Sequence, residues 1–248
     1  MANEILVSVV MPVYNGANYI KNAIESVKKQ QVSWELYVID DCSTDQTPLV
    51  LEEYQKDERI HIIRNQKNIG VAESRNVGIR NARGKYVAFL DADDWWTADK
   101  LKIQCELLEQ KQLVLCCTGR ELMQPDGSST GKIIHVPEQI TYSMLLYTNH
   151  IPCSSVVMQT AVAREFYMEH AELHEDYILW LKVLKKYGTV CGIDEPMLKS
   201  RLSEGGKSRN KIRSARMHWN VYRFMGIGRI KAAWYMIHYV INGLKKYA

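Results

Sequence analysis

The chain has 248 residues, of which 46% are hydrophobic and 24% charged, a soluble-type composition with enough apolar residues to bury a full core. Six cysteines without a Cys-x-x-Cys spacing indicate reduced core thiols in a cytosolic protein and argue against disulfides or zinc. The net charge of +4 hides an asymmetry, because residues 1–198 carry 20 Lys and Arg against 27 Asp and Glu, whereas residues 199–248 carry 12 against one Glu. The basic surface is therefore expected in the tail. Glu4 and Pro12 interrupt the first apolar run, so no signal peptide is expected.

The first hundred residues alternate strand and helix patterns. Strands are predicted at residues 6–13, 34–39, 60–63 and 86–90, and helices at 17–29, 46–56 and 71–82. This alternation predicts an α/β fold with a parallel, Rossmann-like sheet. Because parallel strands end at one edge of a sheet, one crevice should collect the residues that follow the strands. These are Tyr14, Asp41, Asp91 and Asp93.

A strand that runs directly into carboxylates is the central feature of the chain. Residues 86–90 are mostly apolar, and Asp91 and Asp93 follow them two positions apart. Both carboxylates can offer oxygen to Mg²⁺ or Mn²⁺ and leave other positions to water or phosphate. The pattern is weak alone and needs its context. Asp94 is expected to precede a helix that begins near residue 97 and ends near residue 111, and we leave it out of the metal site.

The second half is less regular. Strands are predicted at 113–118, 120–124 and 133–136, which makes the sheet mixed, and a short helix at 160–168. A further helix opens at Glu175 and Asp176. Acidic residues in a first turn are common for helix-dipole reasons alone, so a structural role for this pair stays open.

Five blocks occur in a characteristic order over about 170 residues. They are VVMPVYN at 9–15, IDDCSTDQT at 39–47, NIGVAESRN at 68–76, FLDADD at 89–94 and EDYILW at 175–180. This series resembles the signature of family 2 inverting glycosyltransferases, which have the GT-A fold. The chain departs from the family pattern in two places: Cys42 stands where the family usually has Gly, and residues 200–208 lack a His that supplies a third metal ligand in some members.

The resemblance also implies that the second half holds the acceptor and that residues 152–158 form the strand lining the sugar site. It implies a role for each candidate residue. Pro12 and Tyr14 would frame and stack on a uracil ring, and Asp41 would accept its N–H. Arg75 would reach the base or the phosphates, and Asp91 the ribose. Asp93 would bind Mn²⁺ or Mg²⁺, which neutralises the leaving diphosphate. Asp176 would be the single base that takes a proton from the acceptor hydroxyl, as inversion requires.

Some of these side chains, and several of their neighbours, also have a simpler structural interpretation. Asp40, Ser43 and Asp45 fit capping and loop roles, which we favour for the last two. Tyr14 could be a packing residue, and Arg75 part of a solvated helical face. His174 could tune the base or hold the acceptor, although a structural role is the more common one for an isolated His.

The tail, residues 208–248, predicts two helices broken near residues 226–228. Its stretch 232–241 is rich in Trp, Tyr and Ile and has basic flanks, but it is too short to span a bilayer, which needs roughly 20 residues. We expect either a helix lying in a membrane interface or a helix packed on the catalytic domain. Nucleic-acid binding is not expected, because no recognisable module is present.

These patterns lead to one functional expectation. The chain should divide into a catalytic domain at 1–205, with a nucleotide-sugar half at 1–100 and an acceptor half at 101–205, and a basic amphipathic tail at 206–248. It is expected to transfer a sugar from a UDP-sugar to a hydroxyl of a polyprenyl-diphosphate-linked saccharide in bacterial surface polysaccharide biosynthesis. Its expected place is the cytoplasm, peripheral on the inner face of the membrane, with a homo-oligomer possible. The alternative is a non-catalytic nucleotide-sugar-binding or scaffold subunit. A nucleotidyltransferase is disfavoured because no Gly-rich phosphate loop follows the first strand.

Overall fold

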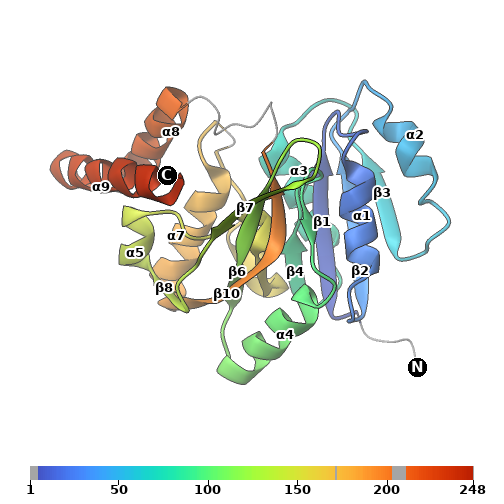
Figure 1. Cartoon of the computed structure of the whole chain (residues 1–248), viewed down its shortest axis with the longest axis horizontal. Coiled ribbons are helices and arrows are strands. Elements are labelled where there is room, and N and C mark those ends of the chain that lie inside the picture. Colours follow the sequence, from blue (N-terminus) through green and yellow to red (C-terminus); the bar gives the residue numbers. More distant parts are fainter. Residues whose placement is uncertain (1–4, 171, 203–210, 248) are drawn as a thin grey trace.

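The computed structural model describes residues 5–170, 172–202 and 211–247, and these form one ten-stranded mixed sheet with helices on both faces (Figure 1). The strand order along its main path is β3-β2-β1-β4-β9-β6-β10-β5. The first four are parallel: β1 (Val7–Val13), β2 (Trp34–Asp40), β3 (Ile60–Arg64) and β4 (Tyr86–Phe89). Helices α1 (Ile20–Lys28), α2 (Thr47–Glu52) and α3 (Val71–Asn81) connect them. The predicted alternation is therefore confirmed, although α1 begins later and α2 ends earlier than expected.

The second half of the sheet differs from the prediction in three places. The two strands predicted at 113–118 and 120–124 are one continuous strand, β6 (Leu115–Met123). Gly119, which separated them in the prediction, lies inside this strand, where a Cβ would be 3.0 Å from the Glu195 carbonyl oxygen of the neighbouring strand. The strand predicted at 152–158 is a 3₁₀ turn, η1 (Cys153–Ser155), followed by β9 (Val157–Gln159). Strand β10 (Thr189–Arg201) was not predicted, since Gly192 and Pro196 interrupt its apolar pattern; the chain tolerates Pro196 because the register with β6 shifts there.

The remaining strands lie around this half. They are β5 (Trp95–Trp96), β7 (Ser129–Ile134) and β8 (Gln139–Thr141), which pair with β10, β6 and β10, respectively. Both parallel and antiparallel pairs occur here, so the expectation that the second half of the sheet is mixed is confirmed.

Two apolar cores cover the two faces of the sheet. One joins α1 and α4 (Lys100–Lys111) to the strand side chains on their face, and the other joins α3 and α7 (Glu175–Tyr187) to the opposite side chains. In β1, Val9 and Met11 belong to the first core and Val10 to the second, as the two-residue period of a strand requires. All seven β1 residues are buried, which explains their nearly continuous apolar run.

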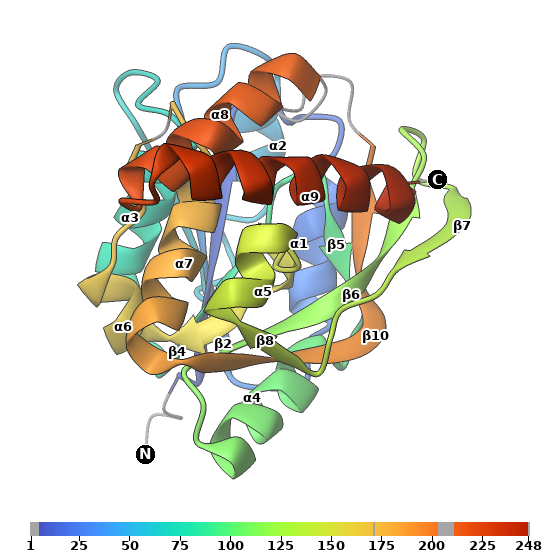
Figure 2. The same ribbon diagram turned by 90° about the vertical axis from the view of Figure 1, so that its left-hand side faces the viewer.

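The C-terminal helices pack on the second core. After α5 (Tyr142–Tyr147) and α6 (Thr160–Glu165) come α7 and then α8 (Lys211–Phe224) and α9 (Arg229–Tyr247); Figure 2 shows α9 running across the molecule outside α5 and α7. Val221, Tyr222 and Ala232 are fully buried. The predicted helix break is confirmed, and so is packing of the tail on the catalytic domain. No helix among the described residues is long and apolar enough to cross a bilayer. The predicted domain boundary at 205/206 lies outside the described residues. So do residues 203–208 of the segment 200–208, which lacks the His that is a third metal ligand in some family members.

Candidate functional site

The predicted site lies where β4 ends before its neighbour β1. The last β1–β4 pair is Val10 with Phe89, so Pro12 lies two residues beyond it and needs no N–H on that side. Pro12 is buried and pairs only with Ile39 of β2. Tyr14 follows with 52% of its surface exposed, which leaves its ring available to a ligand and disfavours a purely packing role.

Hydrogen bonds fix the loop that carries Tyr14. The backbone N–H of Asn15 donates to Ser43 Oγ at 2.9 Å, and that of Ala17 to Asp45 Oδ2 at 3.1 Å. Asp45 Oδ1 also accepts from the Thr47 N–H at 2.9 Å. The loop roles predicted for Ser43 and Asp45 are thereby confirmed, although α2 begins at Thr47 with Gln46 as its N-cap.

Asp41 is held by the protein itself. Its Oδ1 accepts from Asn65 Nδ2 and from the Ile69 N–H, both at 2.9 Å, and its Oδ2 accepts from the Gly70 N–H at 2.8 Å. With 4% exposure it fastens the loop that enters α3. Recognition of a base by Asp41 stays a prediction. The next residue, Cys42, has a φ of 65°, so the position where the resembled family has Gly requires the left-handed backbone that Gly adopts most easily.

Arg75 joins the two halves of the site. Its Nη2 donates to Asp91 Oδ1 at 2.6 Å and its Nη1 to Glu175 Oε1 at 3.0 Å. Only 4% of Arg75 is exposed, so it is a buried bridge and not the solvated helical face considered above. The end of β4 and the first turn of α7 are therefore side by side, and any contact of Arg75 with phosphate or base stays a prediction.

Asp176 follows Glu175 in that first turn. Its Oδ1 accepts from the Tyr177 N–H at 2.8 Å. Burial raises the pKa of the Asp176 carboxyl, and the negative charge of Glu175 raises it further, while Arg75 and His174 act in the opposite direction. A carboxylate with a raised pKa accepts a proton more readily, which suits a general base. His174 lies 3.3 Å from Ser214 Oγ and from its carbonyl oxygen, so it contacts α8.

Three carboxylates crowd the end of β4. Asp94 is buried and accepts the Arg201 N–H at 3.0 Å, and burial together with the charges of Asp93 and Asp91 raises the pKa of Asp94 to about 8. A divalent ion would relieve this mutual repulsion, and hard carboxylate oxygens are the donors that Mg²⁺ and Mn²⁺ prefer. The described residues contain no group of three or more His, Cys, Asp or Glu placed to hold a metal. The carboxylates of Asp91 and Asp93 are oxygen donors of the type that fits such an ion.

Two neighbours of the site had no role assigned in the sequence analysis. Arg201 was counted with the basic tail, yet it is 8% exposed and its Nε donates to the Asp93 carbonyl at 3.1 Å. Ser154 Oγ accepts from the Asp91 N–H at 3.1 Å, which places η1 against the carboxylate turn. Only long-range strand pairing brings Arg201 to the site, so no local pattern could have identified it. Ser154 belongs to the segment 152–158, which the resemblance placed at the sugar site, although as a strand and without a role for this residue.

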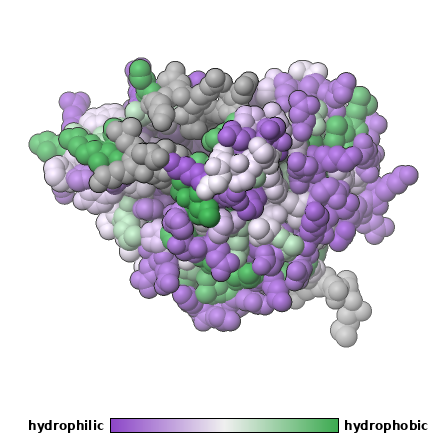
Figure 3. All heavy atoms as spheres, viewed as in Figure 1, coloured by the Kyte–Doolittle hydropathy of each residue, from purple (hydrophilic) through white to green (hydrophobic). Residues whose placement is uncertain are grey.

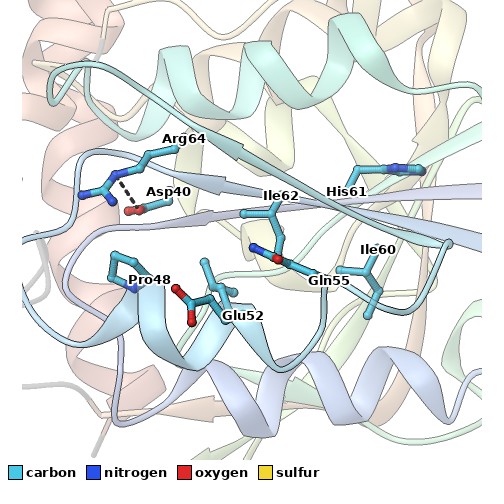
Figure 4. A pocket seen from close by; sticks show the side chains of 9 residues that line it. Asp40, Pro48, Glu52, Gln55, Ile60, His61, Ile62 and Arg64 are labelled. Carbon is cyan, nitrogen blue, oxygen red and sulfur yellow. Dashed lines mark ion pairs between the residues drawn. The ribbon is translucent and has the colours of Figure 1, made fainter.

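A separate groove lies at the free edge of β3. It has a volume of about 610 Å³, lies between α2 and β3, and includes the Arg64–Asp40 ion pair at 3.4 Å (Figure 4). Arg64 Nη2 also donates to the Ser43 carbonyl at 3.1 Å, so the pair supports the back of the β2–α2 loop. Asp40 thus has the structural role that the sequence left open.

Comparison with known proteins gives a consistent result. The family model described as Glycosyl transferase family 2 matches residues 8–164. TuaG of Bacillus subtilis, named as a teichuronic acid biosynthesis glycosyltransferase, is 38% identical over 244 residues, which is 97% of each chain. WfgD of Escherichia coli, named as a UDP-Glc:alpha-D-GlcNAc-diphosphoundecaprenol beta-1,3-glucosyltransferase, is 33% identical over 254 residues, covering 99% of this chain and 96% of WfgD.

Solved structures share the architecture. The crystal structure of S. aureus TarS 1-349 in complex with UDP-GlcNAc superposes with a TM-score of 0.74 over 90% of this chain and 66% of that chain, at 22% identity. At this identity the likeness establishes the fold, which is GT-A. Since the family model spans most of the chain and two relatives align along nearly all of it, the protein belongs to glycosyl transferase family 2 and is a glycosyltransferase.

Proposed function

We propose that this chain transfers a sugar, with inversion, from a UDP-sugar to a hydroxyl of a polyprenyl-diphosphate-linked saccharide used in bacterial surface polysaccharide. One observation carries the proposal: Arg75 binds Asp91 of the nucleotide half and Glu175 of the acceptor half, and Glu175 adjoins Asp176. A carboxylate suited to accept a proton therefore lies next to the strand end where a donor would bind.

The donor site is proposed at the ends of β1, β2 and β4. Exposed Tyr14 would lie against the uracil ring over Pro12, with Asp41 reading the base edge. Asp91 would contact the ribose with one carboxylate oxygen, while Arg75 holds the other carboxylate oxygen of Asp91. The names of WfgD and of the TarS complex, which include UDP-Glc and UDP-GlcNAc, support a uridine donor.

The proposed base is Asp176. It would take the proton of the acceptor hydroxyl while that oxygen attacks the anomeric carbon from the face opposite the leaving diphosphate. A single base without a carboxylate nucleophile gives one displacement and hence inversion. Asp176 is half-buried, which leaves it within reach of an acceptor hydroxyl.

Asp93 is proposed to hold Mn²⁺ or Mg²⁺, together with the donor diphosphate. The ion would supply charge neutralisation for the leaving group. The neighbouring backbone is already fixed, because Arg201 Nε donates to the Asp93 carbonyl at 3.1 Å and the Arg201 N–H to Asp94 at 3.0 Å. Arg201 thus holds the backbone that carries Asp93.

The acceptor is proposed from the relatives, since the name of WfgD specifies a diphosphoundecaprenol-linked GlcNAc. Such an acceptor would place the enzyme at the inner face of the cytoplasmic membrane. A short-chain polyprenyl-diphosphate-GlcNAc with a panel of nucleotide sugars tests the proposal through UDP release and through the anomeric configuration of the product. We expect one UDP-sugar to be favoured and Asp176→Asn to lose at least about 100-fold in kcat. Equal calorimetric affinity for UDP and GDP, or turnover by Asp176→Asn at the native rate, would contradict it.

A further inference from the structure

Helix α9 has two apolar faces that point in opposite directions. Ala232 is buried, and Tyr235, Met236 and Tyr239 lie on the same side of the helix, packed against the domain or stacked on its aromatic rings. Ile230, Trp234, Ile237 and Ile241 are 89%, 55%, 56% and 43% exposed. At about 100° per residue these four fall within roughly 60° of one another, on the side away from the domain. We call them the outer stripe.

The outer stripe is not needed to attach α9 to the protein. The inner side already makes that attachment, since Tyr239 stacks on His218 at 3.7 Å and Tyr147 meets Tyr235 edge to face at 5.1 Å. A helix that also exposes a row of large apolar residues has a second partner, because scattered surface residues would not align along one side. Figure 3 shows hydrophobic spheres at the end of the molecule where Figure 1 places α9.

The charges around the stripe identify the partner. Residues 205–248 contain ten Lys and Arg and no Asp or Glu. Arg229 and Lys231 are exposed and flank Ile230, at roughly 100° to either side of the stripe. This is the arrangement in which apolar side chains enter a lipid interface while long basic side chains reach the headgroups.

A second copy of the chain suits the stripe less well. A twofold contact through α9 would bring two surfaces of the same positive charge together, and the helix has no acidic residue to pair with them. An anionic lipid surface supplies both the apolar interior and the opposite charge. We propose that the outer stripe of α9 docks this protein on anionic membrane, with the helix axis parallel to the bilayer plane.

This orientation gives the surface a place in the proposed reaction. Tyr239 stacks on His218, which stacks on Tyr177 at 4.6 Å, and Tyr177 follows Asp176. Two stacking contacts thus link the docking helix to the turn that carries the proposed base. The relevance to a lipid-linked acceptor rests on the proposed function, whereas docking itself requires no substrate.

Vesicle flotation of the full chain tests the proposal directly. The probes are vesicles of phosphatidylcholine alone and of phosphatidylcholine mixed with phosphatidylglycerol, at low and high salt. We expect binding to the mixed vesicles at low salt, and at least about tenfold weaker binding for Trp234→Ser/Ile237→Ser. Arg229→Gln/Lys231→Gln should lose about fivefold per cation at low salt only. Leu49→Ser on α2 removes another apolar side chain, 61% exposed, and should bind as the native chain does.

Three results would overturn the docking surface. They are absence of the native chain from the mixed vesicles at low salt, native-like binding of Trp234→Ser/Ile237→Ser, and a dimer in light scattering that this variant dissociates while vesicles remain unbound. UDP release with a short-chain soluble acceptor separates this proposal from the enzymatic one. Turnover without vesicle binding refutes the surface alone, and vesicle binding without turnover on any donor refutes the enzymatic proposal alone.

Discussion

The bridge between Arg75 and Glu175 gives the sharpest test of the site. Glu175→Gln keeps the size of the side chain and removes one charge from an ion pair whose side chains are 5% and 7% exposed. Breaking a buried pair costs about 3–5 kcal/mol when the remaining charge is uncompensated. Arg75 still has Asp91 at 2.6 Å, so we expect a loss of unfolding free energy near the lower limit, about 3 kcal/mol.

The same change should alter the proposed base. The charge of Glu175 raises the pKa of Asp176 beyond the effect of burial, so its removal lowers that pKa. Asp176 then stays ionised to lower pH, and the acid limb of the kcat/KM profile should move toward lower pH. A merely structural loss would lower the rate at all pH values without moving this limb.

Urea unfolding and a pH–rate profile of the same preparation measure both effects. Glu169→Gln is the matched control, because Glu169 pairs with Lys182 at an exposed site and that pair should contribute less than about 1 kcal/mol. If Glu175→Gln is no less stable than this control, the pair does not join the two halves. An acid limb that stays in place or moves to higher pH would refute the electrostatic link to Asp176.

Three further predictions concern other parts of the molecule. Asp93→Ala should abolish transfer and weaken UDP binding measured by calorimetry with Mn²⁺, and native activity that survives excess chelator would remove the metal from the proposal. Cys42→Gly should raise the free energy of unfolding in urea by about 0.5–1 kcal/mol, because a φ of 65° strains a side chain and relief of that strain exceeds the cost of the extra freedom of the unfolded chain; a lower free energy of unfolding would contradict this. Burial lowers the pKa of fully buried Lys100 to about 7. Between pH 7 and about 10 the unfolded chain therefore binds a proton that the folded protein lacks, so the unfolding free energy should rise with pH by at most about 1.4 kcal/mol per unit. Lys100→Met should flatten this rise, and an unchanged slope would refute the assignment.

The sequence alone determined the parallel half of the fold and the residues at its strand ends. Local signals suffice there, since each strand is a mostly apolar run, each helix follows within a short loop, and parallel strands must end at a common edge. The positions of Tyr14, Asp41 and Asp91 follow from that rule without any knowledge of side-chain contacts. The helix that begins at Glu175 was also predictable, because apolar residues recur at helical spacing from Ile178 onward.

Only the tertiary structure decided which of these residues meet. Arg75 lies 100 residues before Glu175 in the sequence, and neither its helical spacing nor its neighbours indicate that its guanidinium holds two carboxylates from opposite halves. Strand β10 could not be predicted because Gly192 and Pro196 interrupt its apolar pattern. It nevertheless places Arg201 next to Asp93. The two faces of α9 could not be separated in the sequence for a related reason. Both are apolar, and which of them is covered depends on where Tyr147 and His218 lie in the folded chain.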